Sequence, residues 1–205
     1  MTTDKGLCGG VNGILSRQTR AMLNRLTKDG KEYKLLILGE KGRATFSRSH
    51  QDSIISYMTD RTAPYTFSLA SAVAEEMVGG EYNGVHLVFN QFKSAIAYIP
   101  SVKSITPMLD ANCEFFQSKY DMEPDSEPEA LMNFHEYTCA THVFHSLMEN
   151  ATSEQSARMA AMENASNNAA DMINKLTLQY NRARQTRITT ELIEIISGAS
   201  ALEGK

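Results

Sequence analysis

Residues 150–197 read NATSEQSARMAAMENASNNAADMINKLTLQYNRARQTRITTELIEIIS, a stretch without glycine or proline. Residues that favour helices supply much of it. Thr152 or Ser153 can cap the start of a helix, and Gly198 follows where a helix commonly stops. At 1.5 Å per residue such a helix is roughly 70 Å long, about twice the diameter of a small domain. We therefore expect one long C-terminal helix, much of which projects from the domain that carries it.

The apolar residues of this helix follow the alternating three-and-four spacing of a coiled coil, which predicts a partner helix along the seam. The predicted seam consists of Met162, Ala165, Ala169, Met172, Leu176, Tyr180 and Ala183.

Beyond Ala183 the regular spacing loosens and a denser apolar end follows. It is made of Ile188, Leu192, Ile195 and Ile196. Between Asp171 and Glu191 every charge is positive: Lys175, Arg182, Arg184 and Arg187. The pattern alone fits a bundle helix with a solvated basic face, or a shaft whose basic band meets acidic groups of another subunit.

Composition sets wider limits. A chain of 205 residues with 42% hydrophobic content can bury one good core, so we expect a compact domain over residues 1–149 and the long helix over 150–205. The net charge of −4 does not indicate a nucleic-acid binder, and no apolar run is long enough to span a membrane. Cys8, Cys113 and Cys139 lack zinc spacing and suit a reducing compartment.

Periodicity and turn residues indicate an α/β fold in which helices flank a small, Rossmann-like sheet. The predicted helices cover residues 13–28, 66–77 and 128–148, and the predicted strands cover 33–38, 85–92 and 94–99. The last two strands are expected to be neighbours joined by a tight turn.

Two glycine-rich stretches, TDKGLCGGV at 3–11 and GEKGR at 39–43, suggest phosphate-binding loops because glycine leaves backbone N–H groups accessible. Neither matches the dinucleotide or Walker spacing, so structural turns are favoured. A phosphate-binding α/β enzyme remains an alternative that lacks a catalytic constellation.

Three histidines, His135, His142 and His145, lie on the helix predicted before residue 148. They raise the question of a metal site, but structural histidines are the better interpretation because no other ligand cluster accompanies them. We expect no catalytic residue, no metal and no cofactor in this chain.

Two stretches carry a family resemblance. TTDKGLCGGVN at 2–12 resembles the first strand and turn of the globular domain of γ subunits of F-type ATP synthases. Residues 153–201 resemble the C-terminal helix of that subunit almost throughout. Their end, ITTELIE at 188–194 followed by Gly198 and Ala199, fits the family's Ile-Thr-x-Glu signature with a second acid and a Gly-Ala pair.

The resemblance implies a non-catalytic central-stalk rotor that turns inside the ring of α and β subunits and couples proton flow to ATP synthesis or hydrolysis. Its further partners would be δ/ε-type stalk subunits and the membrane c-ring. By motif match, Arg184, Gln185, Thr189 and Glu191 would contact acidic loops of β, and the apolar end from Ile188 would run in a sleeve. The implied location is the matrix side of the mitochondrial inner membrane, with the bacterial cytoplasmic membrane as the alternative.

Members of this family begin with a long N-terminal helix, which this sequence is expected to lack, so the seam would have no partner within the chain. A γ-like coiled-coil adaptor without a rotary role is therefore a second alternative. Arg187 stands where relatives commonly have a small or apolar residue.

Overall fold

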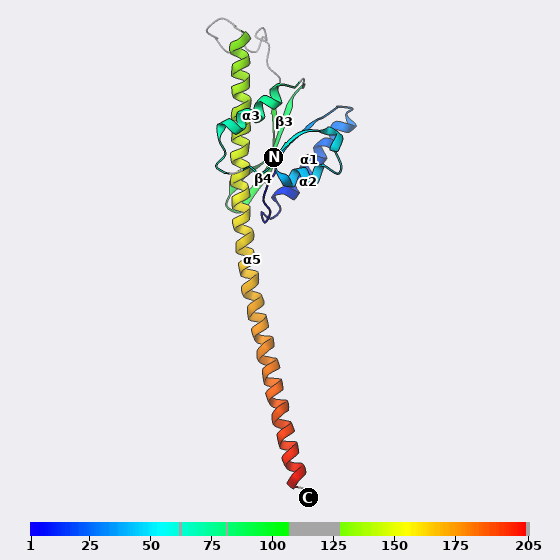
Figure 1. The fold of residues 1–205 in the computed structure, drawn as a ribbon, viewed down its shortest axis with the longest axis vertical. Helices are drawn as coiled ribbons and strands as arrows, with labels where there is room; N and C mark the ends of the chain where they lie inside the picture. The colour runs from blue at the N-terminus through cyan, green and yellow to red at the C-terminus, as the bar shows by residue number, and fades with distance from the viewer. Residues whose placement is uncertain (62, 81, 107–127, 204–205) are drawn as a thin grey trace. The chain divides into compact units, whose positions relative to one another are not determined.

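A computed structural model describes residues 1–61, 63–80, 82–106 and 128–203. Cys113 and the acidic stretch before Pro128 lie outside this range. Two compact units, Met1–Ala161 and Met162–Lys205, divide the chain. The main elements are α1 (Val11–Lys28), β1 (Leu35–Leu38), α2 (Glu40–Phe46), β2 (Ile54–Met58), α3 (Phe67–Val78), β3 (Val85–Ser94), β4 (Ala97–Ile105) and α5 (Pro128–Glu203) (Figure 1).

The strands form two pairs. β1 pairs in parallel with β2, and β3 pairs antiparallel with β4 as predicted, although the tight turn lies at residues 95–96 and not near residue 93. The first residues of the chain link the two pairs, because Met1 N donates to Val88 O at 2.7 Å and Thr2 N donates to Leu38 O at 2.6 Å. The N-terminal segment therefore lies between β1 and β3, as the resemblance to a first strand implies.

Successive residues of β1 face opposite sides, as strand geometry requires. Ile37 packs with Leu23 of α1 and Phe46 of α2 on one side. Leu38 joins the larger core on the other side, where α3 and the N-terminal part of α5 lie. The first unit thus combines small sheets with helices on both sides of β1, which confirms the predicted α/β class.

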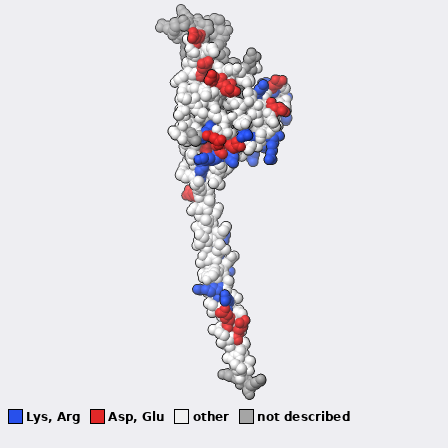
Figure 2. All heavy atoms as spheres, in the orientation of Figure 1, with Lys and Arg blue, Asp and Glu red and all other residues white. Residues whose placement is uncertain are grey.

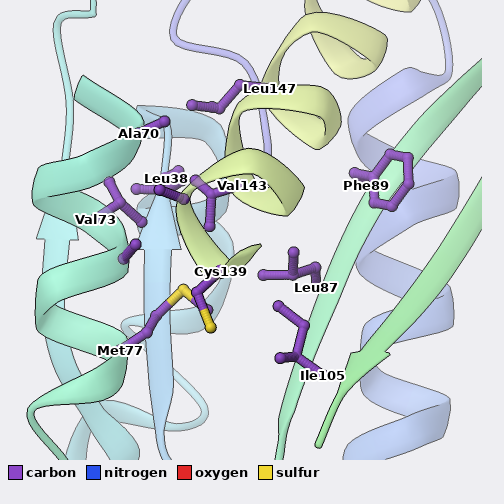
Figure 3. Close-up of a cluster of buried hydrophobic side chains, with 12 residues drawn as sticks. Leu38, Ala70, Val73, Met77, Leu87, Phe89, Ile105, Cys139, Val143 and Leu147 are labelled. Carbon is purple, nitrogen blue, oxygen red and sulfur yellow. The ribbon is translucent and has the colours of Figure 1, made fainter. Parts of the chain in front are cut away.

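The larger core is where α5 enters the fold. Figure 3 shows Cys139, Val143 and Leu147 of α5 between α3 on one side and the strand residues Leu87 and Phe89 on the other. Ala70, Val73 and Met77 of α3 complete this cluster, together with Ile105 of β4. The buried face of α5 in this region is apolar at helical spacing, which is why the segment folds as a helix against the sheet.

The long helix differs from its prediction at both ends. α5 runs without interruption from Pro128 to Glu203 and spans 76 residues. Thr152 does not cap a new helix, because its hydroxyl donates to Met148 O at 2.9 Å inside the helix. Gly198 also lies within the helix. The unit Met1–Ala161 includes the first part of α5, and the predicted boundary at residue 149 stays a prediction.

Three further elements bear on the predictions. Thr66 caps α3, because its side chain accepts a hydrogen bond from Leu69 N. The stretch 39–43 follows β1 and forms the N-cap, Gly39, and the first turn of the short helix α2, as expected for a strand-to-helix connection. β2 was not predicted, since the polar residues before Ile54 mask a strand of only five residues.

No helix in the residues that the structure describes has both the length and the apolar character needed to cross a lipid bilayer.

Candidate functional site

All the residues predicted to contact partners lie in the second unit, on the C-terminal part of α5. Arg184, Gln185, Thr189 and Glu191 are exposed in the single chain, and so are the larger residues of the seam and of the apolar end. Leu176 is 56% exposed and Ile188 is 55% exposed, although leucine and isoleucine are among the residues most often buried. Apolar surface of this extent marks a surface made for another chain.

The predicted seam forms one face of the helix. At about 100° per residue, positions spaced by three and four residues return to the same side of an α-helix. Met162, Met172 and Tyr180, the larger side chains of this face, are each more than half exposed. The small residues Ala165, Ala169 and Ala183 lie on the same face. An apolar face that repeats every three or four residues suits packing with a second helix.

The apolar end occupies a different face. Ile188, Leu192, Ile195 and Ile196 are spaced by four, three and one residues, which places them on roughly the opposite side from the seam. By the same geometry, Gln185 and Thr189 border this stripe on one flank, and Arg184 and Glu191 border it on the other. The four predicted contact residues thus frame the apolar end rather than form a separate patch.

Charge in this region is partly neutralised within the helix. The Arg187 guanidinium donates from Nε to Glu191 Oε1 at 2.8 Å, an i, i+4 pair exposed to solvent. Figure 2 shows basic side chains followed by acidic ones toward the C-terminal end of this helix. Among the described residues no ion pair involves Arg184. Arg184 is therefore available to a partner, whereas Glu191 already has a partner that sequence analysis missed.

The hydroxyl groups on this part of α5 bond to their own helix. Thr189 Oγ1 donates to Gln185 O at 2.9 Å, and Thr190 Oγ1 donates to Thr186 O at 2.9 Å. Each hydroxyl oxygen keeps its acceptor capacity for an outside donor. The predicted role of Thr189 in partner contact is thus restricted to accepting a hydrogen bond while this internal bond persists.

The GEKGR turn is built for packing and not for a phosphate. The first four N–H groups of α2 all have acceptors in the chain: Glu40 N donates to Asp4 Oδ1, Lys41 N to Thr3 O, Gly42 N to Thr2 Oγ1 and Arg43 N to Gly39 O. A helix N-terminus binds an anion through such N–H groups when they are free. Here the N-terminal segment of the chain uses them, which removes the basis of the phosphate-loop alternative at this turn.

The TDKGLCGG stretch is held as a turn by its own side chains. Thr3 N donates to Asn12 Oδ1 at 3.0 Å, and Asn12 Nδ2 donates to Thr3 Oγ1 at 2.7 Å. Gly9 has a φ of 59°, a left-handed conformation that favours glycine. Cys8 is buried beside Thr3 and Asn12. The glycines of this stretch serve a compact connection between the N-terminal segment and α1.

The three histidines do not converge. His135 contacts the Cys139 thiol at 3.6 Å, and among the described residues no group of three or more His, Cys, Asp or Glu side chains is placed to hold a metal. Burial, Lys103 and His145 lower the pKa of His142 from its ordinary value of 6.5. Burial raises the pKa of the Cys139 thiol, with Glu136 adding to the effect. Both shifts favour neutral side chains, as expected for packing residues.

Sequence reasoning missed two polar contact sets in the first unit. Asp4 accepts hydrogen bonds from Arg61 N and Nε, both at 3.2 Å, and the Arg61 side chain is only 3% exposed. On α5, the side chains of Asn150 and Ser153 bond to β3 in the interior. The one available signal was a run of small polar residues where the helix pattern would place apolar ones.

The candidate site is therefore a set of contact surfaces along a helix, which defines a protein that works through other chains. A family model described as ATP synthase matches residues 1–202. The mitochondrial ATP synthase F(1) complex subunit gamma of Rattus norvegicus is 43% identical over 206 residues, which cover 99% of this chain and 74% of the rat protein. The ATP synthase gamma chain of Fuscovulum blasticum is 42% identical, with 98% and 72% covered.

Solved structures agree. A chain of the central stalk and c-ring structure of the Tetrahymena thermophila mitochondrial ATP synthase matches with a TM-score of 0.68 and 31% identity, over 81% of this chain and 74% of that one. A chain of the Euglena gracilis mitochondrial ATP synthase has the same fold, with a TM-score of 0.76 at 23% identity, over 98% and 70%. The chain belongs to the ATP synthase γ-subunit family.

Proposed function

We propose that this chain is the central-stalk rotor subunit of an F1 ATP synthase and couples proton translocation to ATP synthesis or hydrolysis. The observation that carries the proposal is α5, one helix of 76 residues. Its first part is built into the core beside β3. Its last part carries exposed apolar faces framed by charged and polar side chains.

The proposed partners are the α and β subunits of F1, the δ/ε-type stalk subunits and the c-ring. An asymmetric helix inside a ring of three catalytic subunits presents different side chains to each of them. Each angle of the helix therefore favours a different conformation of each β subunit, which is a population shift and not bond chemistry. The chain itself performs no catalytic step in this scheme.

The two faces of the C-terminal part of α5 divide the proposed contacts. The seam from Met162 to Ala183 would receive a second helix, because its apolar residues recur every three or four positions on one face. The apolar end from Ile188 to Ile196 would run against an apolar sleeve, where smooth contact leaves no deep electrostatic minimum at any one angle. Arg184 and Gln185 would meet acidic loops of β. The proposed location is the matrix side of the mitochondrial inner membrane or the bacterial cytoplasmic membrane, since relatives come from both.

The test is ATP-driven proton transport by the complete complex, isolated from membranes through an affinity tag on β and reconstituted into vesicles. We expect this chain to co-purify with α and β, and the Arg184→Ala, Gln185→Ala double variant to transport protons several-fold more slowly. Asn164→Ala with Asn168→Ala, two exposed changes outside the proposed contacts, is the matched control. Isolation of the chain without α and β would contradict the rotor role and support the adaptor alternative.

A further inference from the structure

The attachment of α5 to the sheet contains an arrangement that apolar packing does not explain. β3 pairs with β4 along one edge. Its other edge receives Met1 at Val88, but farther along no strand pairs with it among the residues described. Side chains of α5 take the place of that strand.

Four side chains on one face of α5 bond to this edge and to Ala95 in the turn that follows it. Asn150 Oδ1 accepts from Asn90 N at 3.3 Å and from Asn90 Nδ2 at 3.0 Å. Ser153 Oγ donates to Asn90 O at 3.2 Å. Glu149 Oε2 accepts from Phe92 N at 2.7 Å, and Ser156 Oγ donates to Ala95 O.

The bonds to Asn90 lie in the interior, and those of Glu149 and Ser156 are partly buried. Asn90 and Ser153 are fully buried and Asn150 is 3% exposed. A buried backbone N–H or C=O without a partner is far more costly than a shifted apolar contact, because no water replaces the lost bond. In this setting of α5 the backbone N–H and C=O groups of Asn90 and the N–H group of Phe92 all have partners on the helix.

This constraint acts on rotation as well as on position. Positions 149, 150, 153 and 156 share one face over roughly 10 Å of helix. A displacement by one residue turns an α-helix by about 100° and moves this face away from β3. The apolar contacts of the same helix, such as those of Ala140 and Val143, are non-directional, whereas hydrogen bonds require a particular distance and angle.

We propose that Glu149, Asn150, Ser153 and Ser156 are positioning residues that hold α5 against β3 at one rotational angle. Torque then passes between the sheet domain and the helix without rotation of the helix against the strand. The consequence for coupling rests on the proposed rotor function. These four positioning residues touch neither nucleotide nor proton, and they act through the angle at which α5 is held.

The first experiment measures the junction directly, in the complete complex. Spin labels at Ile99 of β4 and Met159 of α5, both exposed in the chain, report the distance distribution across the junction. We expect the Asn150→Leu, Ser153→Ala variant to broaden this distribution. Ser146→Ala is the matched control: it also removes a fully buried hydroxyl from α5, but that hydroxyl bonds to His142 O of its own helix.

The second experiment measures protons transported per ATP hydrolysed by reconstituted complexes. We expect the Asn150→Leu, Ser153→Ala variant to hydrolyse ATP at a near-native rate and to transport at least twofold fewer protons per ATP, whereas Ser146→Ala keeps the native ratio. A merely structural role would lower thermal stability and leave this ratio unchanged. A native ratio of protons to ATP together with a native distance distribution in the Asn150→Leu, Ser153→Ala variant would overturn the proposal.

If the Asn150→Leu, Ser153→Ala variant fails to assemble, a second variant, Asn90→Cys with Asn150→Cys, replaces it. A short cross-linker that a reductant cleaves joins the two cysteines. We expect a native ratio while the link is intact and a lower ratio after cleavage in the same sample; equal ratios would overturn the proposal. Failure of the proposed rotor function has a different signature, because the unmodified chain would then support no coupled transport. The distance measurement would still test the positioning role of the four residues.

Discussion

The carbonyl oxygen of Thr2 lies where a side chain on Gly39 would have to be: a Cβ built on Gly39 falls 2.4 Å from it. Gly39 also has a φ of 110°, a conformation that side chains rarely adopt. The N-terminal segment and the start of α2 thus approach each other through a position that only glycine fills.

Gly39→Ala is accordingly expected to destabilise the first unit by about 3 kcal/mol, through backbone strain and overpacking together. Urea unfolding followed by circular dichroism measures this. The control is Gly30→Ala, which also has a positive φ, of 67°, but has nothing within 4 Å of the added Cβ. It isolates backbone strain and should cost about 1 kcal/mol. Equal losses in the two variants would show that the approach of Thr2 is not what excludes a side chain.

Asp4→Ala is expected to lower the free energy of unfolding by about 3 kcal/mol, because it leaves the buried Arg61 guanidinium without its carboxylate. The same unfolding assay checks this. Glu40→Ala removes a carboxylate from the exposed pair with Arg43, whose side chains are both 44% exposed, and should cost less than about 1 kcal/mol. A loss for Asp4→Ala no larger than for Glu40→Ala would mean that burial adds nothing to the Asp4–Arg61 pair.

His142 should make stability depend on pH. Its pKa is lowered in the folded chain by burial, by Lys103 of β4 and by His145 of α5, so the unfolded chain takes up a proton first as pH falls below about 6.5. The unfolded state then binds more protons than the native one, and the free energy of unfolding decreases with acidification in that range. Unfolding at pH 7.5, 6.5 and 5.5 should show a shallower dependence for His142→Gln than for the native chain. Identical slopes would refute this assignment.

Arg184 and Arg187 are expected to differ in partner binding although they are only three positions apart in the sequence. Arg187 is paired with Glu191 at 2.8 Å, so its charge is already compensated. Under the proposed contact with acidic loops, Arg184→Gln should weaken assembly with α and β and reduce its sensitivity to salt. Arg187→Gln should change both less. Titrations of assembly at several salt concentrations measure the difference, and a reversed order would place the partner's acidic groups nearer to Arg187.

The elements that sequence reasoning found are those whose signals are local. α3 was predicted near its true bounds because Thr66 caps it and its apolar residues recur at helical spacing. The β3–β4 pair was predicted because alternating residues flank a tight turn. The seam spacing on α5 was likewise visible in the sequence, since it requires only one helix.

The features that it missed depend on residues far apart in the chain. Thr152 can cap a new helix or bond to the carbonyl four residues back, and the local sequence permits both. Packing of α5 along β3 favours a helix that continues through Thr152 over one that starts there. Asn90 and Asn150, whose hydrogen bond belongs to that packing, are 60 residues apart, so no pattern in either segment predicts their contact. The Arg187–Glu191 pair was within reach of an i, i+4 argument.

The dependence of β3 on side chains of α5 has a consequence for biosynthesis. A ribosome completes β3 and β4 well before residues 149–156 emerge, so the edge of β3 that these residues cover is unprotected during that interval. Open strand edges are templates for aggregation in nascent and partly folded chains. Chaperones acting on this protein during translation would therefore be needed most after β4 is made, and would be released once α5 reaches the strand.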